Sequence, residues 1–150
     1  MKKDSQIKFN VIGKQIKFTI LGKPQALKRA RHVFKNGKSY CYDSQKEQKR
    51  ADRVQISSQM SDQGVIRKLD GHLNVKLIFH MGGAGNVKTE HLNGLPFDRT
   101  PIDIDNMIKF YLDTMNDLVY IDDRQVTNIE AEKIYSDDKR VEIFINKIEM

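Results

Sequence analysis

The stretch Pro101-Ile102-Asp103-Ile104-Asp105-Asn106-Met107-Ile108-Lys109 places two carboxylates and an ammonium close together in a basic chain. A residue that precedes a proline favours extended backbone, so this stretch is expected to start strand-like, with Asp103 and Asp105 on one side. In a regular helix the two side chains would diverge by about 200°. We therefore expect a helix that begins at or after Asp105, with Asp105 as its N-cap.

The residues after this stretch predict an amphipathic helix that ends near Asn116-Asp117. Apolar side chains recur there at steps of three and four, at Met107, Ile108, Tyr111, Leu112, Met115 and Leu118. Lys109 falls on the polar side with Asn106 and Asp113. Its ammonium is therefore expected within one turn of the Asp103 and Asp105 carboxylates.

A second acidic group, Asp122-Asp123, precedes a segment rich in β-formers, residues 126–134. Neighbouring strand residues face opposite ways, so only one of these two aspartates should join Asp103 and Asp105. Three carboxylates within about 4 Å repel one another by several kcal/mol, and a hard divalent cation removes that conflict. Oxygen ligands favour magnesium or manganese. The alternative is that these aspartates are caps and a turn.

These residues together resemble a known family of enzymes. The pattern Pro-x-Asp-x-Asp-Asn-x-x-Lys, a helix and then Asp-Asp-x-Gln-Val strongly resembles the RusA family of Holliday junction resolvases, over roughly residues 15–148. The resemblance implies that Asp103, Asp105 and Asp123 bind metal and that Lys109 is catalytic. Asp122 also matches the motif, with a less defined role. The long stretch 82–100, which contains Gly82-Gly83-Ala84-Gly85, departs from the family pattern.

The resemblance also implies an activity. It predicts a Mg²⁺-dependent endonuclease, with Mn²⁺ as substitute, that acts as a homodimer and cuts two strands of a four-way DNA junction symmetrically in recombination and repair. Family members are often encoded by prophages. Two other hypotheses stay open from the residues: a DNA-binding module without turnover, and a magnesium nuclease of flaps or duplex DNA.

Charge is distributed unevenly along the chain. Residues 1–53 carry a net charge of +11, whereas residues 54–150 carry −5. The basic part includes a predicted loop in which Phe34, Tyr40 and Tyr42 are interleaved with cations. The candidate DNA-binding residues are Lys23, Lys28, Arg29, Arg31, Lys35 and Lys38, which suit contact with phosphates while the aromatic rings stack on exposed bases. The alternative is a solvated loop whose aromatic side chains pack locally.

The remaining pattern predicts a single α+β domain with a mixed sheet and two main helices. Residues 6–14 are nearly repeated by residues 15–23, and each copy alternates like a strand; the first copy, within residues 1–14, is an extra strand paired as a hairpin or a competitor for the same place. Ser44 and Glu47 have capping-box spacing and open a polar helix toward Met60. Residues 73–81 predict a half-buried strand, and Val141, Ile143 and Ile145 share one face of a last strand.

Size and composition restrict the class of protein. The chain has 150 residues and 17.4 kDa, which is enough for one domain with a core. No apolar run approaches the roughly 20 residues that a membrane helix needs, and the N-terminus does not resemble a signal peptide. Cys41 is the only cysteine, so an intrachain disulfide is impossible and a cytoplasmic location is expected.

Overall fold

The computed structural model describes residues 9–83, 92–99 and 102–149. Its strands and helices follow in the order β1 (Val11–Leu21), β2 (Arg31–Lys35), β3 (Lys38–Tyr42), α1 (Lys46–Asp62), β4 (Leu73–Met81), α2 (Ile104–Met115), the 3-10 helix η2 (Asp123–Gln125), β5 (Val126–Ile134) and β6 (Lys139–Ile148). Four strands form a sheet in the order β1-β6-β4-β5, and β2 pairs with β3 separately. The predicted α+β fold with a mixed sheet and two main helices is confirmed.

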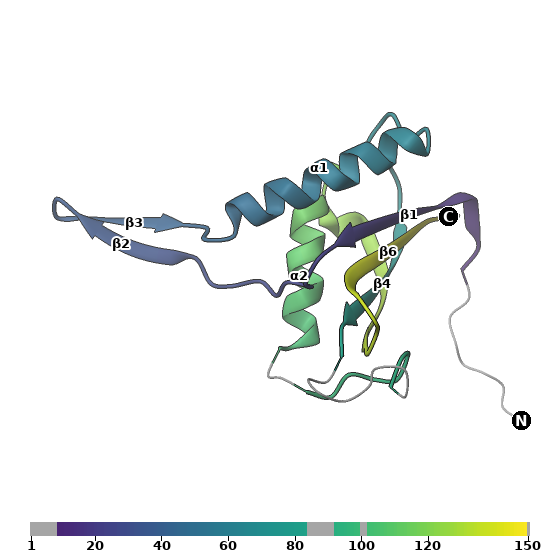
Figure 1. Cartoon of the computed structure of the whole chain (residues 1–150). Coiled ribbons are helices and arrows are strands. Elements are labelled where there is room, and N and C mark those ends of the chain that lie inside the picture. The colour runs from purple at the N-terminus through teal and green to yellow at the C-terminus, as the bar shows by residue number, and fades with distance from the viewer. Residues whose placement is uncertain (1–8, 84–91, 100–101, 150) are drawn as a thin grey trace, which may run out of the picture.

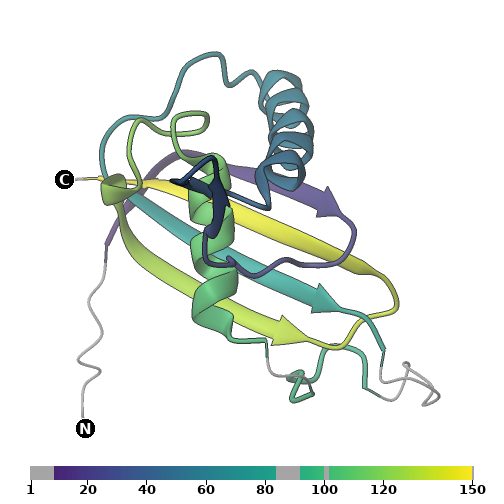
Figure 2. The same cartoon turned by 90° about the vertical axis from the view of Figure 1, so that its left-hand side faces the viewer.

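Both helices cover the same face of the four-stranded sheet, as Figure 2 shows. Strands β4 and β5 are parallel, while β6 runs antiparallel to β1 and to β4. Alternate residues of these strands point under the helices, so the side chains of Leu77 and Phe79 on β4 and of Ile143 on β6 are fully buried. They pack with Phe110 and Tyr111 of α2 to form the core.

Strand β4 buries one face completely, as predicted, whereas its second face is buried at Asn74 and His80 but only partly at Lys76 and Ile78. The two buried polar side chains of this second face have partners on neighbouring strands. Asn128 donates a hydrogen bond to Asn74 across the β4–β5 pair, and the Nε2 atom of His80 lies 2.8 Å from a carboxylate oxygen of Glu142 on β6. These cross-strand contacts give each of the two buried polar side chains a hydrogen-bond partner in place of water.

Of the two alternatives for the near repeat at the N-terminus, the hairpin is not formed within the described residues. The end of the first copy of the near repeat and the whole second copy form one strand, β1, which pairs with β6. Gly13 has φ +73°, and the pairing with β6 is irregular between Ile12 and Ile16. Such an irregularity lets one strand continue through a local kink. Residues 1–8 of the predicted extra strand lie outside the described residues.

Glutamine side chains of α1 pair with the outer edge of β1. The backbone N–H and C=O groups of Lys17 and of Thr19 each bond the amide group of one glutamine, Gln63 and Gln59 respectively, at 2.7–3.0 Å. Gln55 accepts in the same way from the N–H of Leu21 at 3.2 Å. Residues four apart lie on one side of a helix, so the three amides follow the strand. This role explains why α1 is so polar.

The start of α1 differs from the prediction. Gln45 occupies the N-cap position without a side-chain cap, so the capping box of Ser44 and Glu47 is not formed. The side chain of Gln45 is buried and bonds residues 26 and 28 instead: it accepts from the N–H of Lys28 at 2.9 Å and donates to the carbonyl of Ala26 at 2.8 Å. The start of α1 therefore holds the basic segment before β2.

Strands β2 and β3 form a hairpin that projects from the body of the molecule (Figure 1). The predicted loop is therefore wrong for residues 31–42. Asn36 and Gly37 both have positive φ, at 52° and 74°, which is the backbone that a two-residue hairpin turn requires and which Asn-Gly adopts readily. Among the described residues, no helix has the length and apolar character needed to cross a membrane.

Candidate metal and DNA-binding site

Asp103 and Asp105 lie at the N-terminal end of α2. The helix begins at Ile104 and Asp103 is its N-cap residue, with φ −80° and ψ 132°, so the prediction that Asp105 is the N-cap is wrong. The extended stretch ends one residue earlier than expected, and Asp105 belongs to the first turn. Both side chains are exposed, and the carboxylate of Asp103 forms no cap hydrogen bond. Negative groups are favoured at this end of a helix.

Lys109 lies one turn beyond Asp105 on the exposed side of α2, as predicted. Between them, the backbone carbonyl of Asn106 accepts a hydrogen bond from the N–H of Leu27 at 2.9 Å. One turn later, the hydroxyl of Tyr111 accepts from the N–H of Gln25 at 2.9 Å. The segment that carries Lys23, Lys28 and Arg29 is therefore attached to the part of α2 that presents Asp105 and Lys109.

Asp122 and Asp123 belong to a tight turn that precedes β5. The carboxylate of Asp122 accepts a hydrogen bond from the N–H of Arg124 at 3.0 Å, and the side chain of Gln125 accepts from the N–H of Asp122 at 3.2 Å. These two bonds form a capping box for η2. Gln125 also donates to the carbonyl of Leu69 at 2.9 Å, which joins the turn to the segment before β4.

The two adjacent carboxyl groups interact directly. The prediction that Asp122 faces away from Asp123 in an extended strand is therefore wrong, because the chain turns through η2 at this point. Partial desolvation, together with the hydrogen bond and repulsion from Asp122, raises the pKa of Asp123 above its ordinary value. The hydrogen bond from the N–H of Arg124 lowers the pKa of Asp122. The pKa values of two neighbouring carboxyl groups usually move apart in this way.

A single chain does not bring Asp103, Asp105 and Asp123 together. Asp103 caps the beginning of α2, whereas the N–H of Asp123 donates to the side chain of Asn116 at its end, at 3.1 Å. A helix of 12 residues separates them, about 18 Å at 1.5 Å per residue. Among the described residues, no three His, Cys, Asp or Glu side chains are placed to hold one metal ion. The expectation that the three aspartates form one cluster within a single chain is therefore wrong. The helix between Asp103 and Asp123 keeps the two residues at opposite ends.

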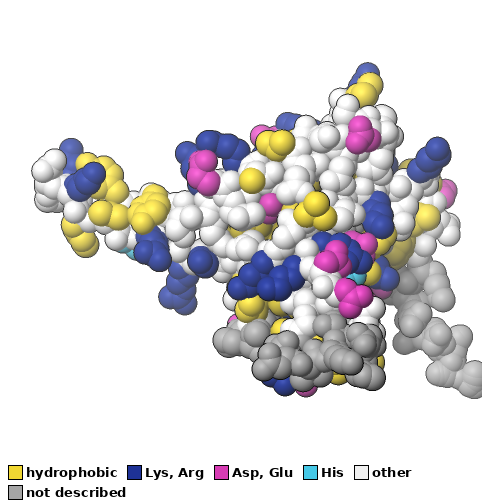
Figure 3. Space-filling view, in the orientation of Figure 1, with side chains coloured by type: hydrophobic (Ala, Val, Ile, Leu, Met, Phe, Trp, Pro, Cys, Tyr) yellow, Lys and Arg dark blue, Asp and Glu magenta, His cyan; other side chains and the backbone are white. Residues whose placement is uncertain are grey.

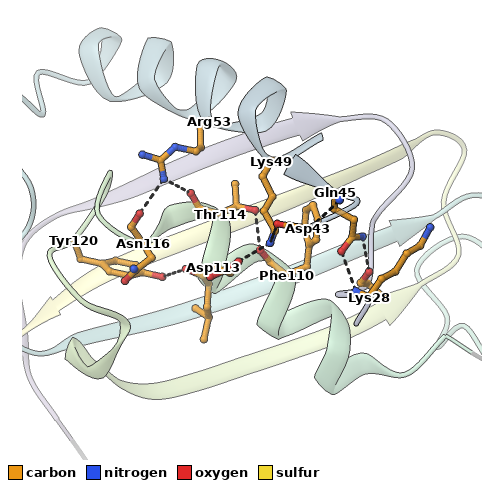
Figure 4. A network of polar contacts seen from close by, with 12 residues as sticks. Lys28, Asp43, Gln45, Lys49, Arg53, Phe110, Asp113, Thr114, Asn116 and Tyr120 are labelled. Atoms are coloured by element: carbon orange, nitrogen blue, oxygen red, sulfur yellow. Dashed lines mark hydrogen bonds and ion pairs between the residues drawn. The ribbon is translucent and has the colours of Figure 1, made fainter. Parts of the chain in front are cut away.

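A network of polar contacts joins α1 to the second half of α2 (Figure 4). Lys49 of α1 bonds carboxylate oxygens of Asp113 at 2.6 Å and Asp43 at 2.8 Å. Burial lowers the pKa of Lys49, but the hydrogen bonds to these two carboxylates outweigh that effect and leave the pKa raised. Arg53 donates to the backbone carbonyls of Thr114 and Asn116 at 3.0 and 2.9 Å. This network was not predicted, because its partners are far apart in sequence.

The candidate DNA-binding side chains are accessible to solvent. All six predicted DNA-binding residues, Lys23, Lys28, Arg29, Arg31, Lys35 and Lys38, are exposed. The first three lie in the irregular segment before the hairpin, and the other three lie on the hairpin itself. Figure 3 shows basic and hydrophobic side chains mixed along this projection. The sequence signal that was missed is the Asn36-Gly37 turn between two alternating runs.

The comparisons with known proteins agree with the motif. The family model described as "Endodeoxyribonuclease RusA" matches residues 22–146. A relative in Bacillus subtilis (strain 168), the "Uncharacterized protein YqaN", is 31% identical over 137 residues, which cover 89% of this chain and 96% of the relative. The family match includes the basic segment, the hairpin, both helices and all the candidate aspartates. The chain therefore belongs to the RusA family of endodeoxyribonucleases.

Proposed function

We propose that this protein is a Mg²⁺-dependent endonuclease that resolves four-way DNA junctions, with Mn²⁺ as a substitute. The observation that carries the proposal is the placement of Asp105 and Lys109 on one exposed side of α2, with the basic segment bonded to the same side through Leu27 and Asn106. Cations that hold a phosphate backbone lie beside carboxylates that suit a hard metal ion.

The proposed metal ligands are Asp103 and Asp105 of one subunit together with Asp123 of the partner subunit. Within a subunit these residues lie at opposite ends of α2, so a shared ion requires a second copy. Two α2 helices that pack antiparallel about a two-fold axis place the beginning of one helix beside the end of the other. Such a pair gives two equal sites, each with three carboxylates. A bound divalent ion would lower the pKa of a water molecule and neutralise phosphate charge.

The flank of α2 opposite α1 suits this contact. Helix α1 packs on the side of α2 that carries Phe110, Asp113 and Thr114. On the other side, Ile104, Ile108 and Leu112 follow at steps of four and are only partly buried. Ile129 of the edge strand β5 lies 39% exposed. A second copy that covers these apolar side chains would gain hydrophobic free energy.

A homodimer also matches the symmetry of the proposed substrate. Resolution of a four-way junction needs two cuts at symmetry-related phosphates, and a two-fold assembly supplies two equivalent sites. Lys109 lies within two turns of Asp103 on the same exposed surface. Its ammonium is proposed to stabilise the charge that develops on the phosphate.

The experiment compares a labelled synthetic four-way junction with a linear duplex of the same arm sequence and with a flap, each with Mg²⁺ or with EDTA. Paired nicks on opposing strands of the junction, with Mg²⁺ alone, are the expected result. Equal cutting of the flap or duplex would instead indicate a general nuclease, and binding without any cut would indicate a DNA-binding module.

Mixed dimers test the composite site. Subunits with Asp103→Asn lose the ligand at the beginning of α2, and subunits with Asp123→Asn lose the ligand after its end. A mixture of the two variants forms dimers in which one site carries both substitutions and the other site carries neither. We expect that mixture to recover single nicks, while each variant alone is inactive. Absence of any recovery in proven mixed dimers would contradict the shared site.

A further inference from the structure

The proposed cleavage chemistry gives no role to the aromatic side chains of the β2–β3 hairpin. Directly opposed residues of an antiparallel pair share a face, so the register sorts the hairpin into two faces. One face, which we call the Tyr40–Tyr42 face, consists of Arg31, Val33, Lys35, Lys38, Tyr40 and Tyr42; the other consists of His32, Phe34, Ser39 and Cys41. The apolar and basic side chains are therefore not mixed at random.

The Tyr40–Tyr42 face has an apolar centre and basic ends. Val33 lies opposite Tyr40 in the middle, next to Tyr42, whereas Lys35 and Lys38 lie opposite one another beside the turn. Val33, Lys35, Tyr40 and Tyr42 line one shallow hollow. The side chains of Val33, Tyr40 and Tyr42 are 37%, 49% and 46% exposed. Apolar groups grouped in this way mark a contact surface more often than scattered ones do.

The hairpin lacks the support that a two-stranded unit normally needs. All ten residues of β2 and β3 are exposed, and Figure 1 shows the hairpin projecting away from the sheet and helices. A hairpin of two strands is only marginally stable in water without a third strand or a helix on its face. Contact with a partner would therefore stabilise this hairpin in its projecting position.

Charge indicates which kind of partner fits. Between residues 22 and 42 the chain contains six Lys or Arg residues and no Asp or Glu. A second copy of the protein, with a net charge of +6 despite the net −5 of its residues 54–150, complements such a surface less well than a polyanion does. A polyanion fits it well, because each contact with a phosphate releases condensed counterions.

The centre of the face distinguishes unpaired nucleotides from duplex DNA. A two-stranded ribbon can enter the major groove, but base edges are read there chiefly by hydrogen-bonding side chains. Val33, Tyr40 and Tyr42 instead offer apolar and aromatic surface, which matches the faces of bases. Base faces are hidden within a stacked duplex and become accessible where strands branch or are unpaired.

We propose that the Tyr40–Tyr42 face stacks on unstacked bases at the branch point, while Arg31, Lys35 and Lys38 contact the flanking phosphates. The inference rests on the proposed action on branched DNA and assigns selectivity for that structure to the hairpin. The hairpin is attached where selectivity can affect cleavage. Leu27 bonds the carbonyl of Asn106 on α2, and Gln45 bonds Lys28 and Ala26 at the root of the hairpin.

The test measures the affinity of the full-length protein for three labelled DNAs: a four-way junction, a matched duplex and an oligothymidine single strand. Binding is measured in EDTA, so that cleavage does not interfere. We expect Tyr40→Ala and Tyr42→Ala each to weaken junction and single-strand binding by on the order of 10-fold, with little effect on the duplex. Tyr40→Phe and Tyr42→Phe keep the ring and should bind as the wild type does.

Phe34→Ala is the matched control. The sequence grouped Phe34 with the two tyrosines as a ring that could stack on bases, but the register places it on the opposite face of the hairpin, where it is 78% exposed, so no contact with DNA is proposed for it. This variant should leave all three affinities unchanged. The dependence of binding on salt gives a second, independent readout. Loss of Tyr40 or Tyr42 should leave the log–log salt slope unchanged, whereas Lys35→Gln and Lys38→Gln should each reduce it by roughly 0.7 to 0.9.

The outcomes separate this inference from the proposed function. A wild-type protein that neither prefers nor cuts branched DNA would refute the proposed function. A protein that cuts junctions, but in which Tyr40→Ala and Tyr42→Ala resemble Phe34→Ala, would refute only the role of this face. An equal loss of duplex affinity would show that the face grips duplex DNA, and dissociation of the dimer in light scattering would show that it covers a second copy; either result overturns the proposal.

Discussion

An aspartate pair lies at each end of α2, one at its first turn and one in the neighbouring η2 turn, and the two pairs are held in different ways. At the beginning of the helix, Asp103 and Asp105 are exposed and, within the described residues, their side chains take part in no hydrogen bond or ion pair. At the other end, Asp122 caps a turn and contacts Asp123, whose own N–H is bonded to Asn116. The first pair is available for a ligand, whereas the second is already part of a rigid turn.

This difference bears on the proposed dimer, in which one helix would serve two sites. In that dimer, Asp123 would reach the metal ion from across the interface, and a ligand placed in this way benefits from a rigid support such as the η2 turn. Binding of a cation by Asp103 and Asp105 would break no existing contact, because their carboxylates stabilise no turn. Substitutions at the two ends should therefore affect activity and stability in different proportions.

The largest effect is expected at the beginning of α2. Asp105→Asn keeps the size of the side chain but removes a charged metal ligand, so cleavage of the junction should fall by at least about 100-fold, since even groups behind a metal ligand contribute 10- to 100-fold. Melting temperature and junction affinity in EDTA should not decrease. Single-turnover cleavage and thermal melting measure the two quantities. A similar fall with Asp62→Asn, an exposed carboxylate on α1, would contradict the assignment.

Substitutions in the η2 turn should distinguish the proposed metal ligand, Asp123, from the capping residue, Asp122. Asp123→Asn should abolish cleavage, whereas Asp122→Asn should reduce it much less, because an asparagine at this position can still accept the hydrogen bond from Arg124. Asp122→Ala removes the cap and should cost about 1 kcal/mol of unfolding free energy. Urea unfolding and junction cleavage distinguish these variants. If Asp122→Asn proved more harmful to cleavage than Asp123→Asn, the ligand would be Asp122.

Two lysines allow a proposed catalytic cation on α2 to be compared with a structural cation on α1. Lys109→Ala should slow turnover with a stability change below about 0.5 kcal/mol, because its side chain is exposed. Lys49→Ala should lower the unfolding free energy by about 1 kcal/mol, because it removes a largely buried ammonium that bonds two partly exposed carboxylates. A large loss of stability with Lys109→Ala would identify it as a structural residue instead.

The smallest effect on cleavage is expected at Asp52, a buried residue of α1 whose contribution to stability should depend on pH. Its side chain is buried, with one oxygen accepting from Gln48 and the other unpaired. Desolvation raises the pKa of Asp52 to about 6, so the folded state binds this proton more tightly than the unfolded state does. Ionisation of Asp52 should therefore lower stability as pH rises from 4 to 7, by on the order of 1–3 kcal/mol.

Asp52→Asn tests that sign. The variant should melt at a higher temperature than the wild type at pH 7.5 and should lose that advantage at about pH 3, below the ordinary aspartate pKa of 3.8, where Asp52 is largely protonated in both states. Cleavage of the junction should change little, because Asp52 lies away from the exposed side of α2. A variant that is equally stabilised at both pH values would show that ionisation is not the cause.

The sequence predicted the parts of the fold that depend on local periodicity. Strand β5, the alternating face of β6 and the end of α2 near Asn116 all lie where the pattern placed them. The hairpin was missed although Asn36-Gly37 signals it, because the flanking strands are basic and exposed and so lack a buried face. The role of α1 was missed because its glutamines bond the backbone of a distant strand, which no pattern within the helix records.

In the candidate site, too, the features that depend on local spacing were predicted and those that depend on distant residues were not. The exposed position of Lys109 beside Asp105 followed from helical spacing. The relation of Asp103 to Asp123 did not, because residues 20 apart in the chain can be neighbours or a whole helix apart. The contact between Asp122 and Asp123 also depended on a turn that β-propensity does not indicate.

The row of glutamines on α1 has a consequence for the dynamics of the sheet. Strand β1 is at the edge, where backbone N–H groups usually meet water and exchange their hydrogens quickly. The N–H groups of Lys17, Thr19 and Leu21 instead donate to Gln63, Gln59 and Gln55. Exchange of these hydrogens with deuterium should therefore require α1 to move away from β1. Slow exchange at these three positions of an outer strand would then measure how firmly α1 is held against the sheet.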